Sequence, residues 1–173
     1  FEYFPGLPIH HSKDLVNWEL IGHGIHREDQ CNGEMNLVDV QSDGGIHAPT
    51  IRHNKGTFYI ITTNIYSPLD GKPAKMINFI ITAKDPKGPW SEPHIIVGAP
   101  GIDPDIFFDD NNKVYFTGTH SPGDMNTNGI GSIWIQELDV KNWKLINKRH
   151  SVMDGKFGLH TEGPHIYKEH GIY

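Results

Sequence analysis

Three short stretches of this sequence place a polar or charged side chain beside a proline, directly before an apolar run. We call them the first mouth (His47-Ala48-Pro49), the second mouth (Ile102-Asp103-Pro104) and the third mouth (Glu162-Gly163-Pro164). The apolar residues that follow are two positions apart, which is typical of a β-strand with one buried face. Two carboxyl groups, Asp103 and Glu162, can perform general acid and base catalysis if their strands bring them together. Alternatively, both carboxyl groups only accept backbone hydrogen bonds at a strand start.

The segments between the mouths repeat one order of elements. Each mouth opens a strand, followed by a turn, a second strand, a loop, a third strand, a turn that runs from Asp to Trp, and a fourth strand. The Asp-to-Trp turns begin at Asp14, Asp85 and Asp139 and end at Trp18, Trp90 and Trp143. Four antiparallel strands in roughly 55 residues are typical of a propeller blade. We expect the tryptophans to pack in the blade cores or between blades.

The repeat predicts an all-β chain that forms part of a β-propeller. The expected blades are the end of blade one at 1–22, blade two at 46–98, blade three at 102–147 and the start of blade four at 157–173. The first strand of each blade lines the central channel, so the three mouths should meet on one face. We therefore expect Asp103 and Glu162 in equivalent positions, with His47 one blade earlier. Since a propeller closes with four or more blades, we expect a piece of a larger ring.

Composition excludes several classes of partner. The 173 residues carry a net charge of −6 without a basic stripe, which argues against nucleic acid or an anionic membrane as a partner. No apolar run approaches the roughly 20 residues that span a bilayer. The frequent Gly (19) and Pro (12) residues favour a loop-rich β domain. The expected protein is soluble; its compartment is not specified, although a single cysteine favours the reducing cytoplasm over a secreted or periplasmic location.

Histidine and cysteine do not form a recognisable metal or nucleophile pattern. The 12 histidines are scattered without a helical His pair or a cysteine partner, so we expect no zinc site, no other metal and no cofactor. Cys31 is interpreted as a loop thiol, because a nucleophilic thiol needs a positioned base. Asp105, Asp109 and Asp110 are interpreted as turn-forming or exposed strand residues.

Four ordered motifs carry a resemblance that covers essentially the whole chain. The segment from Phe1 to Trp18, Gly45-Ile46-His47-Ala48-Pro49, Ile102-Asp103-Pro104 and Thr161-Glu162-Gly163-Pro164-His165 resemble glycoside hydrolase family 43, most closely its β-xylosidase and α-L-arabinofuranosidase branch. The resemblance implies a five-bladed propeller, of which this chain would hold roughly three blades. It also implies inverting hydrolysis with three carboxylates: a base, a carboxylate that tunes the acid, and an acid.

The same resemblance implies roles for individual residues. Glu162 would be the general acid, and Asp103 would orient it and modulate its pKa. Phe1, His47 and Ala48 would contact the sugar, although His47 stands where the family usually has an aromatic residue. The catalytic base would lie upstream of Phe1, so we expect the 173 residues alone to be inactive.

The expected enzyme removes terminal xylose or arabinofuranose from plant cell-wall oligosaccharides, and its full-length form could be an oligomer. Two alternatives stay open: a non-catalytic carbohydrate-binding propeller and an endo-arabinanase on the same fold. The long irregular segment at 23–45 favours a closed, pocket-like site for terminal sugars over an open cleft.

Overall fold

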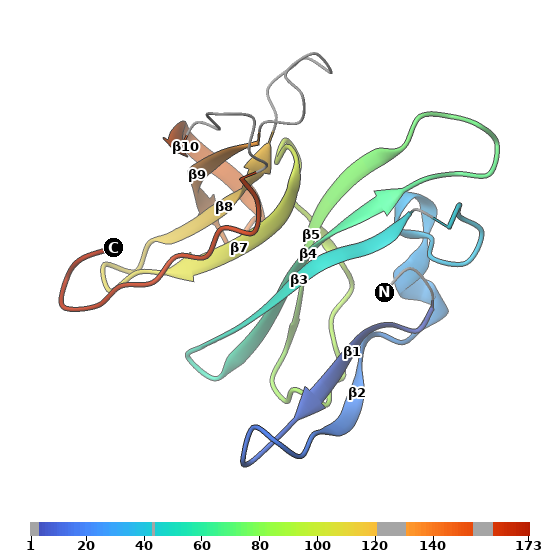
Figure 1. The fold of residues 1–173 in the computed structure, drawn as a ribbon, viewed down its shortest axis with the longest axis horizontal. Helices are drawn as coiled ribbons and strands as arrows, with labels where there is room; N and C mark the ends of the chain where they lie inside the picture. Colours follow the sequence, from blue (N-terminus) through green and yellow to red (C-terminus); the bar gives the residue numbers. More distant parts are fainter. Residues whose placement is uncertain (1–3, 43, 121–130, 154–160) are drawn as a thin grey trace.

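The computed structural model describes residues 4–42, 44–120, 131–153 and 161–173, and in these ranges it forms three antiparallel sheets (Figure 1). The first sheet pairs β1 (Gly6–His11) with β2 (Glu19–Ile25). The second follows the order β3 (Gly45–Asn54), β4 (Thr57–Tyr66), β5 (Lys75–Ala83) and β6 (His94–Ile95). The third contains β7 (Ile102–Phe108), β8 (Val114–His120), β9 (Ser132–Asp139) and β10 (Lys144–Met153).

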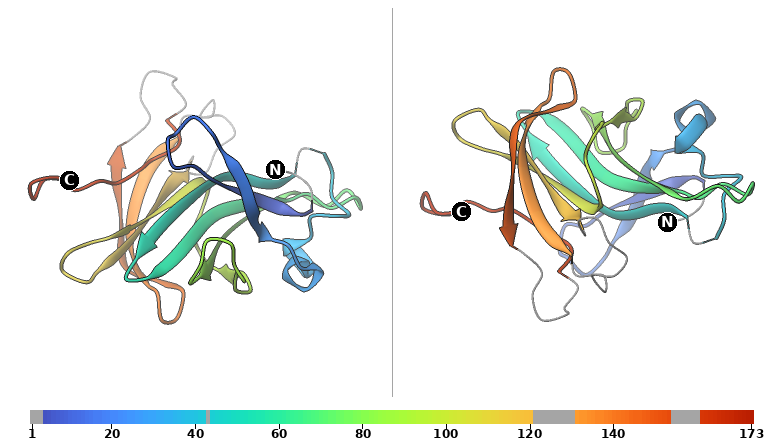
Figure 2. Two further views of the ribbon diagram at one scale, coloured as in Figure 1. Left: turned by 90° about the horizontal axis from the view of Figure 1, so that it is seen from below. Right: turned by 90° about the horizontal axis from the view of Figure 1, so that it is seen from above.

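The inner strands lie next to one another in chain order. Figure 1 shows β1, β3, β7 and the final segment 161–173 following one another across the molecule. Figure 2 shows the same arrangement from two other directions. The described residues contain only two short 3-10 helices, η1 (Glu28–Cys31) and η2 (Gly33–Met35), and neither could cross a membrane. The all-β prediction is therefore confirmed.

The middle sheet is buried on both faces, which explains its nearly continuous apolar sequence. Ile60 and Ile81 belong to a core shared with β1 and β2, whereas their neighbours Ile61 and Ile80 belong to a second core shared with β7–β9. Successive side chains of a strand point to opposite faces, so paired isoleucines serve both cores. Each fully buried side chain of this size contributes about 1.5–3 kcal/mol of transfer free energy. The stacking of three sheets thus follows directly from the strand sequences.

The three Asp-to-Trp turns share a local hydrogen bond but not a common tryptophan environment. Asp14, Asp85 and Asp139 each accept a hydrogen bond from the backbone N–H two residues later. Trp90 is buried in the first core, and Trp143 packs against the second. Trp18 is 56% exposed, so the expectation that all three tryptophans pack inside or between sheets is wrong for this one.

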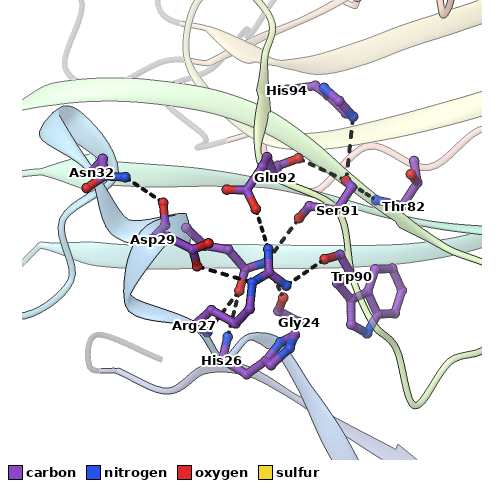
Figure 3. A network of polar contacts seen from close by, with 11 residues as sticks. Gly24, His26, Arg27, Asp29, Asn32, Thr82, Trp90, Ser91, Glu92 and His94 are labelled. Carbon is purple, nitrogen blue, oxygen red and sulfur yellow. Dashed lines mark hydrogen bonds and ion pairs between the residues drawn. The ribbon is translucent and has the colours of Figure 1, made fainter.

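The segment after β2 is irregular but firmly attached to the second sheet. Arg27 donates a hydrogen bond to the carbonyl oxygen of Trp90 (2.9 Å) and forms ion pairs with Asp29 and Glu92 (Figure 3). The buried amide of Gln30 accepts hydrogen bonds from the backbone N–H groups of His26 and Arg27, both at 3.0 Å. A charged side chain and a buried amide thus connect this loop to the strand connection after β5.

Candidate active site

The mouths share an unusual backbone. Pairing of β3 with β4 shifts register between His47 and Thr50, and pairing of β7 with β8 shifts between Ile102 and Asp105. Register shifts of this kind are β-bulges, which re-aim side chains at the ends of strands. The residue before proline has a positive φ in all three mouths: 41° at Ala48, 53° at Asp103 and 62° at Gly163. Only glycine adopts this conformation without strain, and Asp tolerates it better than Ala.

The left-handed residue before each proline shows which positions of the mouths are equivalent. When the mouths are aligned on their left-handed residue, Asp103 corresponds to Ala48 and Gly163, whereas Glu162 corresponds to His47. The expectation that Asp103 and Glu162 occupy equivalent positions is therefore wrong by one residue. The physical reason is that neighbouring positions in an extended chain project in different directions, so a shift of one residue re-aims the side chain.

Asp103 nevertheless reaches the neighbouring mouth. Its Oδ2 accepts a hydrogen bond from the backbone N–H of Gly163 at 3.2 Å. Because Glu162 directly precedes Gly163, the Asp103 carboxylate lies against the peptide bond that joins Glu162 to Gly163. The Glu162 side chain is exposed and has no hydrogen-bond or ion-pair partner within the described ranges, so its carboxylate is free to meet a ligand.

His47 offers one free ring nitrogen at the first mouth. Its Nδ1 lies 2.9 Å from the carbonyl oxygen of Gly45, and because a carbonyl only accepts, Nδ1 carries the proton. Nε2 has no hydrogen-bond partner among the described residues. The backbone carbonyl of His47 is held by the Thr62 hydroxyl at 2.5 Å. Ala48 is exposed beside it, and Phe1 lies outside the described residues.

A buried ion pair lies directly behind the mouths. The Asp105 side chain is 0% exposed, and both of its oxygens face the Arg52 guanidinium, at 2.9 Å from Nε and 2.6 Å from Nη2. The hydrogen bonds with Asp105 raise the pKa of Arg52. The interpretation of Asp105 as an exposed or turn-forming residue is therefore wrong. The available signal was a charge at the centre of an apolar inner strand, where only a paired carboxylate is tolerated.

One cavity adjoins the third mouth. It has a volume of about 670 Å³, lies between β7–β10 and the final segment, and is lined in part by Glu162; its lining is mainly apolar and includes neither Asp103 nor His47. The described residues contain no cluster of three His, Cys, Asp or Glu side chains that could hold a metal ion. Burial raises the pKa of the partly buried Cys31 thiol, which disfavours a nucleophilic thiolate.

The antiparallel sheets, arranged in chain order, define a class of protein, the β-propeller. The chain belongs to glycosyl hydrolases family 43, whose sequence model matches residues 1–173. It is 46% identical to a xylosidase/arabinosidase of Butyrivibrio fibrisolvens, over 100% of this chain and 32% of that protein. It is 40% identical to the non-reducing end alpha-L-arabinofuranosidase BoGH43B of Bacteroides ovatus, over 97% of this chain and 28% of that protein.

Solved structures agree with this assignment. A GH43_12 protein retrieved from a capybara gut metagenome superposes with a TM-score of 0.81 at 35% identity, over 99% of this chain and 32% of that one. Xylan beta-1,4-xylosidase from Bacillus halodurans C-125 superposes with a TM-score of 0.78 at 32% identity, over 98% of this chain and 31% of that one. The predicted propeller fold is confirmed by these neighbours. The chain spans about a third of the length of the curated relatives it matches.

Proposed function

We propose that the protein carrying this chain is a glycoside hydrolase that removes terminal xylose or arabinofuranose from plant cell-wall oligosaccharides with inversion. Glu162 is the general acid that protonates the leaving oxygen, and Asp103 positions it. His47 and Ala48, together with Phe1, contact the sugar. The base that activates water is assigned to no residue of this chain.

One observation carries the proposal: the Asp103 carboxylate accepts a hydrogen bond from the Gly163 N–H at 3.2 Å. This contact holds one carboxylate beside the backbone of the other. Inverting hydrolysis needs an acid that keeps its proton until the leaving oxygen needs it. A negative charge close by disfavours ionisation of a second carboxyl group by like-charge repulsion. Asp103 can therefore orient the Glu162 peptide and also favour the protonated acid.

The environment of Glu162 suits this role. General acids often have weak contacts in the free enzyme and gain their hydrogen bond only with substrate. Glu162 is exposed and unpaired within the described ranges, while the backbone beside it is held. A fixed backbone with a free carboxyl group is the arrangement expected of an acid that must reach a glycosidic oxygen.

The loop after β2 supports action on terminal sugars. The Asn64 amide donates a hydrogen bond at 2.7 Å to the carbonyl oxygen of Glu34, and Asn64 pairs in register with Ile46, the residue before His47. Lys75 forms an ion pair with the Glu34 carboxylate. The loop is therefore attached one strand away from the first mouth, where it can limit the length of a bound oligosaccharide.

The proposal is tested with Glu162→Gln in the full-length protein. We expect turnover of a xylo- or arabino-oligosaccharide to fall roughly 10³-fold, because general acid catalysis contributes about 10²–10⁴. The loss should be smaller for a nitrophenyl glycoside, whose leaving group needs little protonation, and calorimetric sugar binding should persist. Glu169→Gln is the matched control, because Glu169 lies in the same segment with an 88% exposed side chain.

The alternatives give different results. A wild-type protein that binds sugar without turnover, or a Glu162→Gln variant that hydrolyses oligosaccharides normally, contradicts the proposal and favours a carbohydrate-binding propeller. Internal cleavage of arabinan into oligosaccharides favours the endo-acting alternative. NMR of the first product identifies the anomer, and retention of configuration contradicts the inverting mechanism.

A further inference from the structure

We propose that Asp105 and Arg52 form a positioning pair that holds the Glu162 segment in register with the other mouths and keeps the surrounding charge balanced. This inference rests on the proposed function, since it assigns a role toward the general acid. Neither residue touches the sugar in this proposal; both act through the backbone and the local field.

The first argument is connectivity. Asp105 lies on β7, two residues after Asp103, and it binds the side chain of Arg52 on β3 through two parallel hydrogen bonds. Its Oδ2 also accepts the backbone N–H of Ile166 at 3.1 Å and lies 3.4 Å from Nδ1 of His165. One carboxylate therefore joins three neighbouring inner segments just behind their mouths.

The second argument is energetic. Replacing a buried ion pair by apolar residues is often neutral or stabilising, so stability alone is a weak reason to keep one. The forked guanidinium fixes the direction as well as the distance of its partner. Asp105 also accepts a hydrogen bond from the Ile106 N–H of its own strand at 2.8 Å, which further restricts its rotamer. This geometry is suited to setting the register between segments.

The third argument is charge. The charged and titratable groups that contact the pair come from β3 and the final segment: Arg52 and His165 face Asp105, and Tyr167 faces Arg52. Asp103, on β7, faces the backbone beside Glu162. The Arg52 guanidinium lies 5.2 Å from the centre of the Tyr167 ring. Because Arg52 balances the charge of Asp105, the pair itself adds no net charge next to the mouths, whereas Asp103 places a negative charge beside the Glu162–Gly163 peptide. Removing either member leaves one uncompensated charge in a region of low polarity.

The far end of the same two segments provides a matched control. Asp109, at the end of β7, binds Nζ of Lys168 at 2.7 Å and the Tyr173 hydroxyl at 2.9 Å, and its side chain is 1% exposed. This pair also joins β7 to the final segment through a buried carboxylate, and Lys168 lowers the pKa of Asp109. It differs in its position, because it lies at the end of β7 away from the mouths, and within the described ranges it forms no hydrogen bond or ion pair with β3.

The experiment measures the pH dependence of kcat in the full-length protein for Asp105→Asn, Arg52→Met and the double variant. In the plot of kcat against pH, the alkaline limb is the fall in kcat as Glu162 loses its proton. Asp105→Asn leaves the Arg52 cation without its partner, which favours ionised Glu162, so the alkaline limb should move to lower pH by about 0.5–1 pH unit. Arg52→Met leaves an anion, so the limb should move up by a similar amount. The double variant should return the limb to the wild-type position, while kcat stays roughly 10- to 100-fold low because the segment is no longer held.

Two further variants separate this role from general stabilisation. Arg52→Lys keeps the charge without the fork, so it should lower kcat and leave the alkaline limb in place. If Arg52→Met does not fold, Arg52→Gln removes the charge in its place. Lys168→Met should lower the melting temperature but leave kcat within about twofold and the limb unchanged.

The inference is overturned, while the proposed function stands, if the alkaline limb lies at the same pH in wild type, Asp105→Asn and Arg52→Lys and if both variants lose no more kcat than Lys168→Met. Limbs that move in the same direction for Asp105→Asn and Arg52→Met overturn it too. A wild-type protein without glycosidase turnover overturns the proposed function, and this inference with it.

Discussion

The first and second mouths have the same backbone but different chemistry. Both begin an inner strand with a bulge, and both place a left-handed residue before proline. At that position the first mouth has Ala48 and the second has Asp103. Only the second therefore carries a carboxylate, which accepts the Gly163 N–H of the next mouth. The comparison teaches that the repeat supplies the conformation, and that a single side chain turns one copy into a candidate catalytic group.

The comparison also explains the choice of residue. A left-handed backbone costs an L-residue roughly 1–2 kcal/mol, but Asp is among the few residues that visit it readily. Gly163 avoids this cost at the third mouth, while the functional residue there is the preceding Glu162. Ala48 bears the cost without a polar group. The propeller thus repeats a strained turn, and each copy accommodates it differently.

Gly101→Ala should have the largest effect, because it acts on the backbone that leads to Asp103. A Cβ at Gly101 would lie 1.8 Å from the carbonyl oxygen of Thr119, and φ there is +78°. We expect the free energy of unfolding of the full-length protein to fall by about 3 kcal/mol or more, measured by thermal or denaturant unfolding.

Gly98→Ala is the control for that change. Gly98 has nearly the same φ, +80°, but open space around its Cβ position, so only the conformational cost of about 1 kcal/mol should appear. Equal destabilisation by the two substitutions would show that the contact with β8 does not hold the second mouth.

Asp103→Asn should reduce activity with little effect on folding. Asn has nearly the same shape and also tolerates a left-handed backbone, but it brings no negative charge to the Glu162 peptide. We expect kcat to fall roughly 10²-fold with an unchanged melting temperature, since correct protonation and orientation of the acid are both impaired. Asp110→Asn, with an 85% exposed side chain, should leave kcat unaltered. An active Asp103→Asn variant would remove the distinction between the two mouths.

Exchanging Ala and Gly at the left-handed positions should have the smallest effect. Ala48→Gly removes strain at the first mouth and should raise the free energy of unfolding by up to about 1 kcal/mol. Gly163→Ala introduces the same strain where no neighbouring atom interferes, so stability should fall by a similar amount. Differential scanning calorimetry measures both. Changes of the same sign would contradict a shared backbone.

Much of the local structure could be predicted from the sequence because it depends on neighbouring residues. The hairpin of β3 and β4 turns at Asn54–Thr57, where Lys55 and Gly56 both have positive φ. In each expected Asp-to-Trp turn, the side chain of Asp14, Asp85 or Asp139 accepts a hydrogen bond from the backbone N–H two residues later. The exposed position of Trp18 could not be predicted, because the same turn occurs at Trp90, which is buried. Burial of each tryptophan depends on which sheet packs against it, and the local sequence does not predict this.

The sequence by itself determined the all-β repeat, the three mouths and the two carboxylates, because alternation, prolines and turn residues act over a few positions. The tertiary structure alone decided that the Asp103 carboxylate reaches the Gly163 N–H of the next mouth, since that contact joins residues 60 positions apart. It also decided that Asp105 faces Arg52 instead of solvent. That pair joins residues 53 positions apart, and only the packing of one inner strand against the next brings them together.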